Sequence, residues 1–111
     1  MKQGDIIKLD LSPTKGHEQS GYRPVMVVSN SNFNRVTNLI LVCPITSTVN
    51  NFPLHVKLDL SMQTKGVVKC EQVKAVDTTA RPYTVIESAP KNIVNEVIDI
   101  IYGSIEVLDN A

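Results

Sequence analysis

The sequence predicts a mainly β protein that ends in one α-helix, folded as a small, strongly bent antiparallel barrel with the helix packed on it. Three observations predict this class: short apolar segments lie at close spacing, turn-forming residues separate them, and the hydrophobic period becomes helical near the C-terminus. With 111 residues and 42% hydrophobic content, the chain is long enough for one core and too short for two. We therefore expect a single domain over residues 1–111.

The first three predicted strands carry most of the apolar residues. Residues 4–9 form a strand entered through a turn, and residues 25–30 form a longer apolar strand. Residues 39–46 are nearly all apolar, which predicts a strand buried on both faces. Pro44 lies within this third segment and predicts a bulge or a position at the edge of the sheet.

Three further segments complete the predicted sheet. Residues 55–58 and 67–76 alternate between apolar and polar side chains, and residues 84–86 form a short last strand. Because alternate residues of a strand point to the same side, Lys69 and Glu71 are expected to share one face.

The tail of the chain changes to a helical period. Apolar residues recur at helical spacing between residues 90 and 108, which predicts an amphipathic helix. Ser88 can cap this helix, and Pro90 suits its first turn.

The net charge of zero hides an uneven distribution. Residues 1–85 contain ten Lys and Arg against six Asp and Glu, giving +4, whereas residues 86–111 contain one Lys against five acidic residues, giving −4. A basic body permits an anionic ligand, but the neutral total argues against long, sequence-independent binding to duplex DNA.

Neither a membrane segment nor a metal centre is expected. No apolar run follows a basic start and no stretch is long enough to span a bilayer, so we expect a cytoplasmic protein. Cys43 and Cys70 lie in apolar strand-like runs and are expected to be buried free thiols. His17 and His55 lie far apart without any close-spaced ligand pair, so no metal and no cofactor is expected.

The segment from Gly16 to Pro24 has the character of a functional loop. It places His17, Glu18 and Arg23 between glycines, just before an apolar strand that can hold them rigidly. The alternative interpretation is a solvated hairpin loop in which Arg23 and Glu18 form a surface ion pair.

Further polar segments follow or interrupt apolar strands. Residues 46–48, 50–53 and 69–72 carry hydroxyl, amide and charged side chains next to strand-like sequence. Together with the segments listed here they resemble the MazF/PemK family of toxins from bacterial toxin–antitoxin systems, with the Kid (PemK) branch most similar, from Gly4 to about Val97. The other matching segments are Pro13 to Gln19, Gly21, Arg23 to Val25, Phe33 to Thr37 and Gly66 to Val68.

This resemblance implies an SH3-like, CcdB-like barrel that forms a homodimer and acts as a sequence-specific endoribonuclease on single-stranded RNA, chiefly mRNA. In the family the ribose 2′-hydroxyl attacks the adjacent phosphate without a metal, leaving a 2′,3′-cyclic phosphate and a 5′-hydroxyl. It further implies a cognate antitoxin whose acidic, disordered tail covers the basic RNA groove. Operator DNA would be reached only through that antitoxin.

The resemblance also implies catalytic roles. Glu71 takes the position of the aspartate base of the Kid branch, and Lys69 that of its catalytic arginine. Both are departures, because glutamate is one methylene longer and an ammonium cannot contact a phosphate with two prongs. The general acid is therefore Lys69 or His17, whose imidazole titrates near neutral pH. Arg23 matches the arginine that the MazF branch uses at the scissile phosphate, and Thr46 matches the threonine beside it.

The remaining candidates are residues that would bind RNA. Phe52 either stacks on a base or fills the core, and Gln72 either contacts a base edge or ties the strand in place. Phe33 to Thr37 is interpreted as structural. The full set of RNA-binding candidates is Glu18, Gln19, Ser47, Asn50, Asn51, Phe52 and Gln72.

Two alternatives from other classes remain open at the level of sequence. One is a toxin of similar fold that binds a protein target, as the gyrase poison CcdB does. The other is a barrel that binds RNA without cutting it, which the departures at Lys69 and Glu71 would explain. Cleavage of naked RNA by the purified protein discriminates between them and the nuclease.

Overall fold

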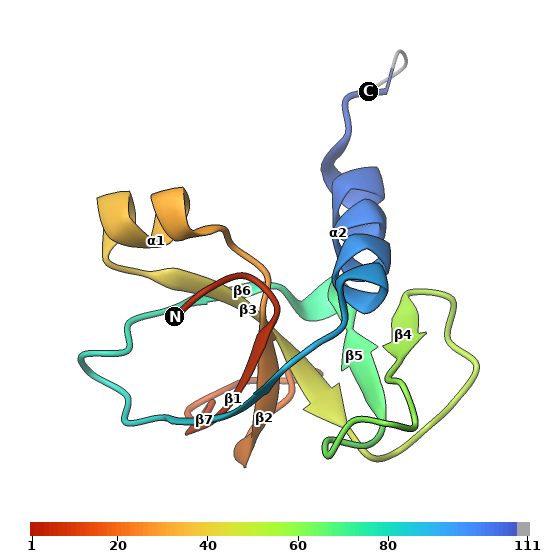
Figure 1. Cartoon of the computed structure of the whole chain (residues 1–111), viewed down its shortest axis with the longest axis horizontal. Coiled ribbons are helices and arrows are strands. Elements are labelled where there is room, and N and C mark those ends of the chain that lie inside the picture. Colours follow the sequence, from red (N-terminus) through yellow and green to blue (C-terminus); the bar gives the residue numbers. More distant parts are fainter. Residues whose placement is uncertain (109–111) are drawn as a thin grey trace.

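The computed structural model describes residues 1–108, which form one seven-stranded antiparallel sheet and a C-terminal helix (Figure 1). Hydrogen-bonded neighbours follow the order β4, β5, β3, β2, β1, β7, and β6 also pairs with β3. The strands are β1 (Asp5–Asp10), β2 (Tyr22–Val27), β3 (Ile40–Thr46), β4 (His55–Lys57), β5 (Val67–Lys69), β6 (Lys74–Val76) and β7 (Thr84–Ser88). The predicted class is confirmed, although β4 and β7 do not pair within the described residues, so the barrel stays open.

Strict alternation in the three central strands divides the apolar residues between two cores. Along β1, Ile6 belongs to one core, whereas Ile7 and Leu9 belong to the other. Because successive side chains of a strand point to opposite faces, this pattern requires that the sheet be covered on both sides. β2 and β3 repeat the pattern, with Met26 and Cys43 in the first core and Val25, Val27, Ile40 and Val42 in the second.

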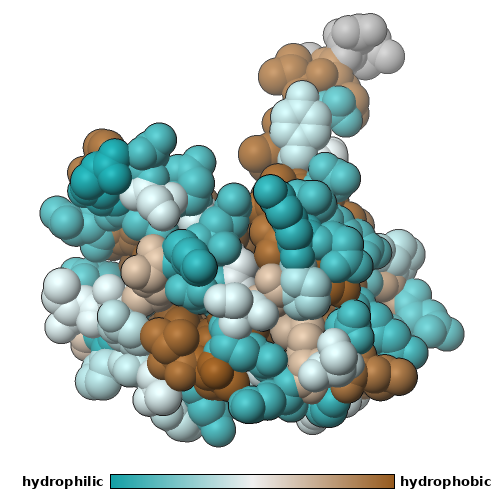
Figure 2. Space-filling model, viewed as in Figure 1, coloured by the Kyte–Doolittle hydropathy of each residue, from teal (hydrophilic) through white to brown (hydrophobic). Residues whose placement is uncertain are grey.

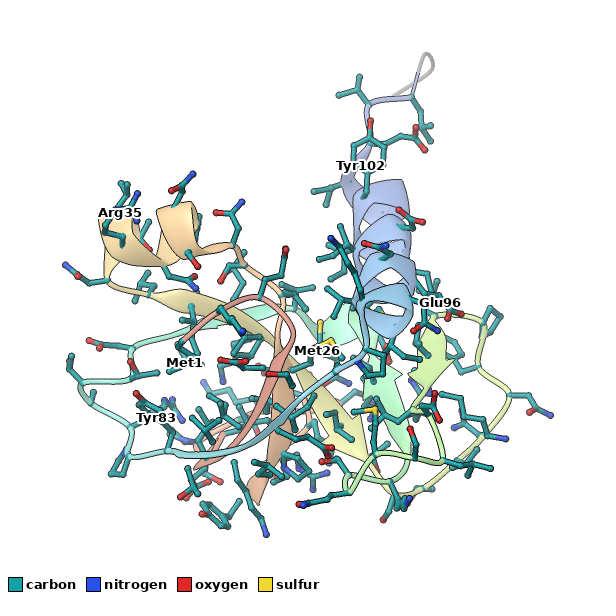
Figure 3. All side chains as sticks on the ribbon, viewed as in Figure 1. Met1, Met26, Arg35, Tyr83, Glu96 and Tyr102 are labelled. Atoms are coloured by element: carbon teal, nitrogen blue, oxygen red, sulfur yellow. The ribbon has the colours of Figure 1, made fainter. Side chains whose placement is uncertain are left out.

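Helix α2 (Lys91–Ile105) covers the first core. Ile93 and Val97 are buried there, and Figure 3 shows Met26 between the strands and the base of the helix. The last turns of α2 project beyond the sheet, where Tyr102 and Ile105 are exposed (Figures 1 and 2). The predicted helix is therefore confirmed, but Ser88 does not cap it. Ser88 ends β7 and donates a hydrogen bond to Asp5, while the helix begins after Pro90 without a side-chain cap.

The strand predicted over residues 67–76 is wrong in its middle. Residues Cys70–Gln72 form a 3₁₀ turn, η1, which separates β5 from β6. Cys70 is buried in the first core, and the turn in which it lies interrupts the backbone pairing of a continuous strand. Alternation along the sequence is equally compatible with a buried residue in a tight turn, so period alone could not detect the break.

Pro44 lies inside the sheet rather than at a bulge or an edge. It pairs with Val25 of β2, and on its other side β3 changes partner from β6, along residues 40–42, to β5, at residues 45–46. Because η1 lies between β5 and β6, neither strand pairs with Pro44 on that side. The missing backbone N–H of proline therefore costs no hydrogen bond there.

The segment interpreted as structural, Phe33 to Thr37, contributes most of a short helix, α1 (Ser31–Thr37). The Asn30 side chain caps its first turn by accepting from the Phe33 amide, and Asn38 ends it in the left-handed region at φ 58°. This helix lies apart from α2 (Figure 1).

Candidate functional site

A groove of about 490 Å³ lies beside the turn that follows β5. Four parts of the chain line it: the loop after β1, the end of β3 with the following loop, β4, and the segment from β5 into η1 (Figure 1). Polar and ionisable side chains dominate, which suits a polar or charged ligand. The lining residues are His17, Gln19, Thr46, Thr48, Asn50, Phe52, His55, Lys69, Glu71 and Gln72.

Strands β4 and β5 place a histidine beside the lysine and the glutamate. In their antiparallel register His55 lies opposite Lys69, so the two side chains share one face. The η1 turn then brings Glu71 to the same groove, where its Oε2 lies 3.1 Å from Nε2 of His55. Lys69 and Glu71 therefore do face one groove as predicted, although a turn and not a strand brings them there.

A network of amide side chains ties the His17 loop to η1. Gln72 Oε1 accepts from the backbone amide of Gln19 at 2.7 Å, and its Nε2 donates to the carbonyl of His17 at 3.2 Å. Lys69 Nζ donates to Gln19 Oε1 at 2.8 Å. Both ends of the Gln72 amide are thus occupied by the loop, which favours the tethering interpretation of this residue over contact with a base edge.

Arg23 lies on β2, outside the residues that line the groove. Continuing the β2–β3 register puts it opposite Thr46, which does line the groove. Two backbone carbonyls hold its guanidinium, because Nε donates to Ser20 at 2.8 Å and Nη1 to Ile45 at 3.4 Å. Within the described residues Nη2 makes no hydrogen bond.

Gly66 sets how closely β5 approaches the end of β3. Its φ is +116°, and a Cβ atom built on it would lie 2.0 Å from the carbonyl oxygen of Thr46. Any other residue would push these segments apart. The position of Thr46 in the groove therefore depends on this glycine.

Phe52 does not fill the core. The residue is 45% exposed, and its ring and that of His55 form a T-shaped pair with centroids 5.0 Å apart. Asn50 Oδ1 accepts from the Phe52 amide, which fixes the loop that presents both side chains to the groove. The aromatic face is thus available for stacking.

Four predicted site residues lie outside the groove: Arg23, Glu18, Ser47 and Asn51. Glu18 lines a neighbouring pocket of about 270 Å³, and its Oε2 accepts from the Lys15 amide. No ion pair joins it to Arg23 in residues 1–108, so the alternative of a surface pair is wrong. Ser47 is exposed in the loop after β3, and Asn51, also exposed, borders a smaller pocket shared with Phe52.

Sequence reasoning missed His55 as a site residue. Its place in an alternating segment was a weak signal, and its proximity to Glu71 depends on the pairing of β4 with β5.

The buried thiols beneath the groove are not reactive groups. Burial, with the nearby Glu71 and Glu96 carboxylates, raises the pKa of Cys70 to about 12, and burial raises the pKa of Cys43 further. Both cysteines are free, as predicted. Within the part of the chain that the structure describes, no three His, Cys, Asp or Glu side chains gather as metal ligands. None of the helices there has the length and apolar character needed to cross a membrane.

Comparison with known proteins assigns this architecture. Residues 2–103 match the model of a family described as PemK-like, MazF-like toxin of type II toxin–antitoxin systems. The chain is 43% identical to the endoribonuclease PemK of Escherichia coli, over 88% of this chain and 77% of that protein. It is 32% identical to the endoribonuclease MazF of Staphylococcus saprophyticus, over 93% and 92%.

Solved structures show the same fold. MazF of Deinococcus radiodurans superimposes with a TM-score of 0.89 at 30% identity, covering 96% of this chain and 97% of that one. A MazE–MazF complex from the same organism gives a TM-score of 0.83 at 30% identity, with 97% of both chains covered.

Proposed function

The chain belongs to the PemK-like, MazF-like toxin family of type II toxin–antitoxin systems, and on this premise we propose that it is an endoribonuclease that cuts single-stranded mRNA at specific sequences. The proposed reaction is attack of a ribose 2′-hydroxyl on the adjacent phosphate without a metal ion, which gives 2′,3′-cyclic phosphate and 5′-hydroxyl ends. Relatives of this chain carry the name endoribonuclease. The site geometry described above supports the chemistry independently.

The observation that carries the proposal is the meeting of Lys69, Glu71 and His17 in one groove. Transesterification of RNA needs a base for the 2′-hydroxyl, an acid for the leaving 5′-oxygen and a cation for the charge that develops on the phosphate. A carboxylate, an ammonium and an imidazole provide these three functions. A surface that only bound a protein would not need them together.

The proposed steps follow from these groups. Glu71 takes the proton of the 2′-hydroxyl as its oxygen bonds to phosphorus, and the bond from phosphorus to the 5′-oxygen breaks as that oxygen gains a proton. His17 or Lys69 gives this proton, and the Lys69 ammonium stabilises the added negative charge. Lys69 is held by Gln19 at 2.8 Å, so its charge is fixed in place before substrate binds.

Binding of RNA is proposed to use residues in the groove and beside it. Arg23, beside the groove, and Thr46, within it, would hold the scissile phosphate, because the anchored guanidinium retains a free Nη2 within residues 1–108. The exposed ring of Phe52 would stack on an unpaired base, and Asn50 would contact a base edge.

A cognate antitoxin and a homodimer are part of the same proposal. A MazF of similar fold has been solved in complex with MazE. The net +4 of residues 1–85 favours an acidic partner segment over the groove, where it would exclude RNA. Light scattering of the purified chain tests the dimer, and inhibition of cleavage by the product of a neighbouring gene tests the antitoxin.

Cleavage of a long unstructured RNA in the presence of EDTA tests the proposed activity. Primer extension locates the ends, and end-specific phosphatase and kinase treatments identify their chemistry. Arg23→Ala and Glu71→Gln should lose cleavage, whereas Glu106→Gln makes the same chemical change at an exposed position beyond α2 and should not. Binding without cleavage would replace the proposal with a non-catalytic RNA-binding barrel, and neither binding nor cleavage would favour a protein target.

A further inference from the structure

His55 is an ionisable side chain of the groove that is almost fully enclosed. Only 5% of the side chain is exposed, against 28% for Glu71, which it contacts. Its ring lies under the edge of Phe52, and its Nε2 is 3.1 Å from Oε2 of Glu71. The other ring nitrogen, Nδ1, is buried without a hydrogen-bond partner among the described residues.

The unpartnered Nδ1 determines where the imidazole proton lies. A proton on Nδ1 would bury an N–H group with no acceptor, whereas an unprotonated Nδ1 buries only an unused lone pair. The proton therefore lies on Nε2, which donates to the Glu71 carboxylate. The direction of this hydrogen bond follows from the burial of the opposite side of the ring.

This hydrogen bond acts on a side chain that otherwise has freedom to move. Glu71 lies on a 3₁₀ turn at the surface of the groove, and a glutamate side chain has three rotatable bonds. His55 is fixed by its strand, by burial and by Phe52, so it offers a rigid donor. It takes up Oε2 only, and Oε1 accepts no hydrogen bond within residues 1–108, so one oxygen remains available to take a proton.

We propose that His55 is a positioning residue that holds the Glu71 carboxylate in the orientation needed for proton abstraction from RNA. This inference rests on the proposed function. His55 is not itself placed in contact with substrate, because its ring is enclosed and, within residues 1–108, the polar contact of the ring is with Glu71. Of the charged groups on neighbouring elements, Lys69 of β5 lies opposite His55, and Glu96 of α2 lies near the buried Cys70.

Two conservative variants separate positioning from a general structural role. In His55→Gln the amide nitrogen comes close to the position of Nε2 and can still donate to Glu71, whereas in His55→Asn the shorter side chain places its amide near Nδ1. Both variants introduce a neutral amide at the same buried position. We expect His55→Asn to lower kcat by about 100-fold, the effect of a misplacement of about 1 Å, with KM little changed. His55→Gln should recover most of that loss.

Two further measurements test the mechanism of this effect. In a Glu71→Gln background, His55→Asn should cause no further loss of kcat, because the two residues act through one carboxylate. Long-range ¹⁵N correlation spectra of the wild type should show a protonated Nε2 and an unprotonated Nδ1 for His55, with the exposed His17 as internal reference.

The outcomes distinguish this inference from the function on which it depends. Equal kcat for both variants and the wild type, or a proton on Nδ1, overturns the role of His55 and leaves the nuclease standing. Losses that are equal in both variants and accompanied by lower melting temperatures overturn it too, in favour of a structural role. A wild-type protein that cuts no RNA overturns both, and the spectra then decide whether the hydrogen bond alone survives.

Discussion

Gln72 is predicted to act on the reaction through the His17 loop, and Gln72→Leu tests this. The substitution removes both hydrogen bonds that join η1 to the loop, one from the Gln19 amide and one to the His17 carbonyl. A hydrogen bond between neutral groups contributes a net ~1 kcal/mol, so their loss lowers the free energy of opening the loop by about 2 kcal/mol. Leucine is similar in size, so packing changes little.

Hydrogen exchange measures this effect directly. A change of about 2 kcal/mol corresponds to about 30-fold faster exchange of the Gln19 amide. The global free energy of unfolding should fall much less, because the loop is exposed and opens locally. RNA cleavage should fall by up to about 100-fold, since His17 loses its fixed position.

Two matched variants sharpen the test. Gln72→Glu keeps an oxygen to accept from Gln19 but replaces the donor to His17 with an oxygen, so the Gln19 amide should stay protected while cleavage still falls. Gln63→Leu changes an exposed glutamine whose side chain makes no hydrogen bond within residues 1–108, and should alter neither readout. Unchanged exchange in Gln72→Leu would refute the tether, and a changed cleavage sequence with unchanged exchange would make Gln72 a base-reading residue.

Three more outcomes are expected on stability and reactivity. Gly66→Ala should lower the free energy of unfolding by about 3 kcal/mol, because of its positive φ and the clash with Thr46, as denaturant titration would measure. Partial desolvation raises the pKa of Glu87, but hydrogen bonds from Thr64 and Gln63 outweigh it, so the pKa is lower in the folded protein than in the unfolded chain. The ionised carboxylate therefore stabilises the fold above the unfolded-chain pKa. This stabilisation is lost as pH falls through the lower pKa of the folded protein. In Glu87→Gln the free energy of unfolding should therefore decrease less steeply as pH falls into the acid range. Both buried thiols should resist a disulfide reagent such as DTNB until the protein unfolds.

Two of these expectations, those for Gly66→Ala and Glu87→Gln, have a control within the chain. Gly103 lies in α2, and a Cβ atom built on it would meet nothing within 4 Å. Because alanine favours a helix more than glycine does, Gly103→Ala should stabilise the protein by about 0.5–1 kcal/mol. Glu106→Gln should not change the loss of stability at low pH, because this residue is exposed and its side chain accepts no hydrogen bond within residues 1–108. Wild-type stability of Gly66→Ala would contradict the argument on the clash with Thr46. A decrease of stability with falling pH that is as steep in Glu87→Gln as in the wild type would contradict the argument on Glu87. Thiols that react at once in the native protein would contradict the argument on burial.

The sheet was predictable because its signal is local. Apolar residues in β1 to β3 alternate or run continuously, and burial on two faces produces such patterns. The break at Cys70 was not predictable, since the turn keeps the burial of Cys70 that a strand would also have. Helix α1 was missed because its seven residues are mostly polar, and its stability depends on the caps Asn30 and Asn38 rather than on an apolar face.

The groove was predictable only in part, for a related reason. Lys69 and Glu71 are close in sequence, so a local pattern could link them. His17 was indicated by its place in a glycine-flanked loop, and Gln19 was identified through resemblance to a family. His55 lies 16 residues from Glu71, and only the pairing of β4 with β5 brings them together. Pairing of strands is a property of the whole sheet, which no short segment of sequence encodes.

The contacts of the groove, considered together, show how Lys69 and Glu71 are held although both side chains are flexible. A lysine and a glutamate have more rotatable bonds than the geometry of catalysis tolerates, so each needs a partner that limits its motion. Lys69 has such a partner in Gln19, at 2.8 Å, and Glu71 has one in His55, at 3.1 Å. Gln72 in turn fixes Gln19, because it accepts from the Gln19 amide. Both flexible side chains are therefore restrained by hydrogen bonds with residues outside the Lys69–Glu71 pair, which is what a proton-transfer site built from flexible side chains requires.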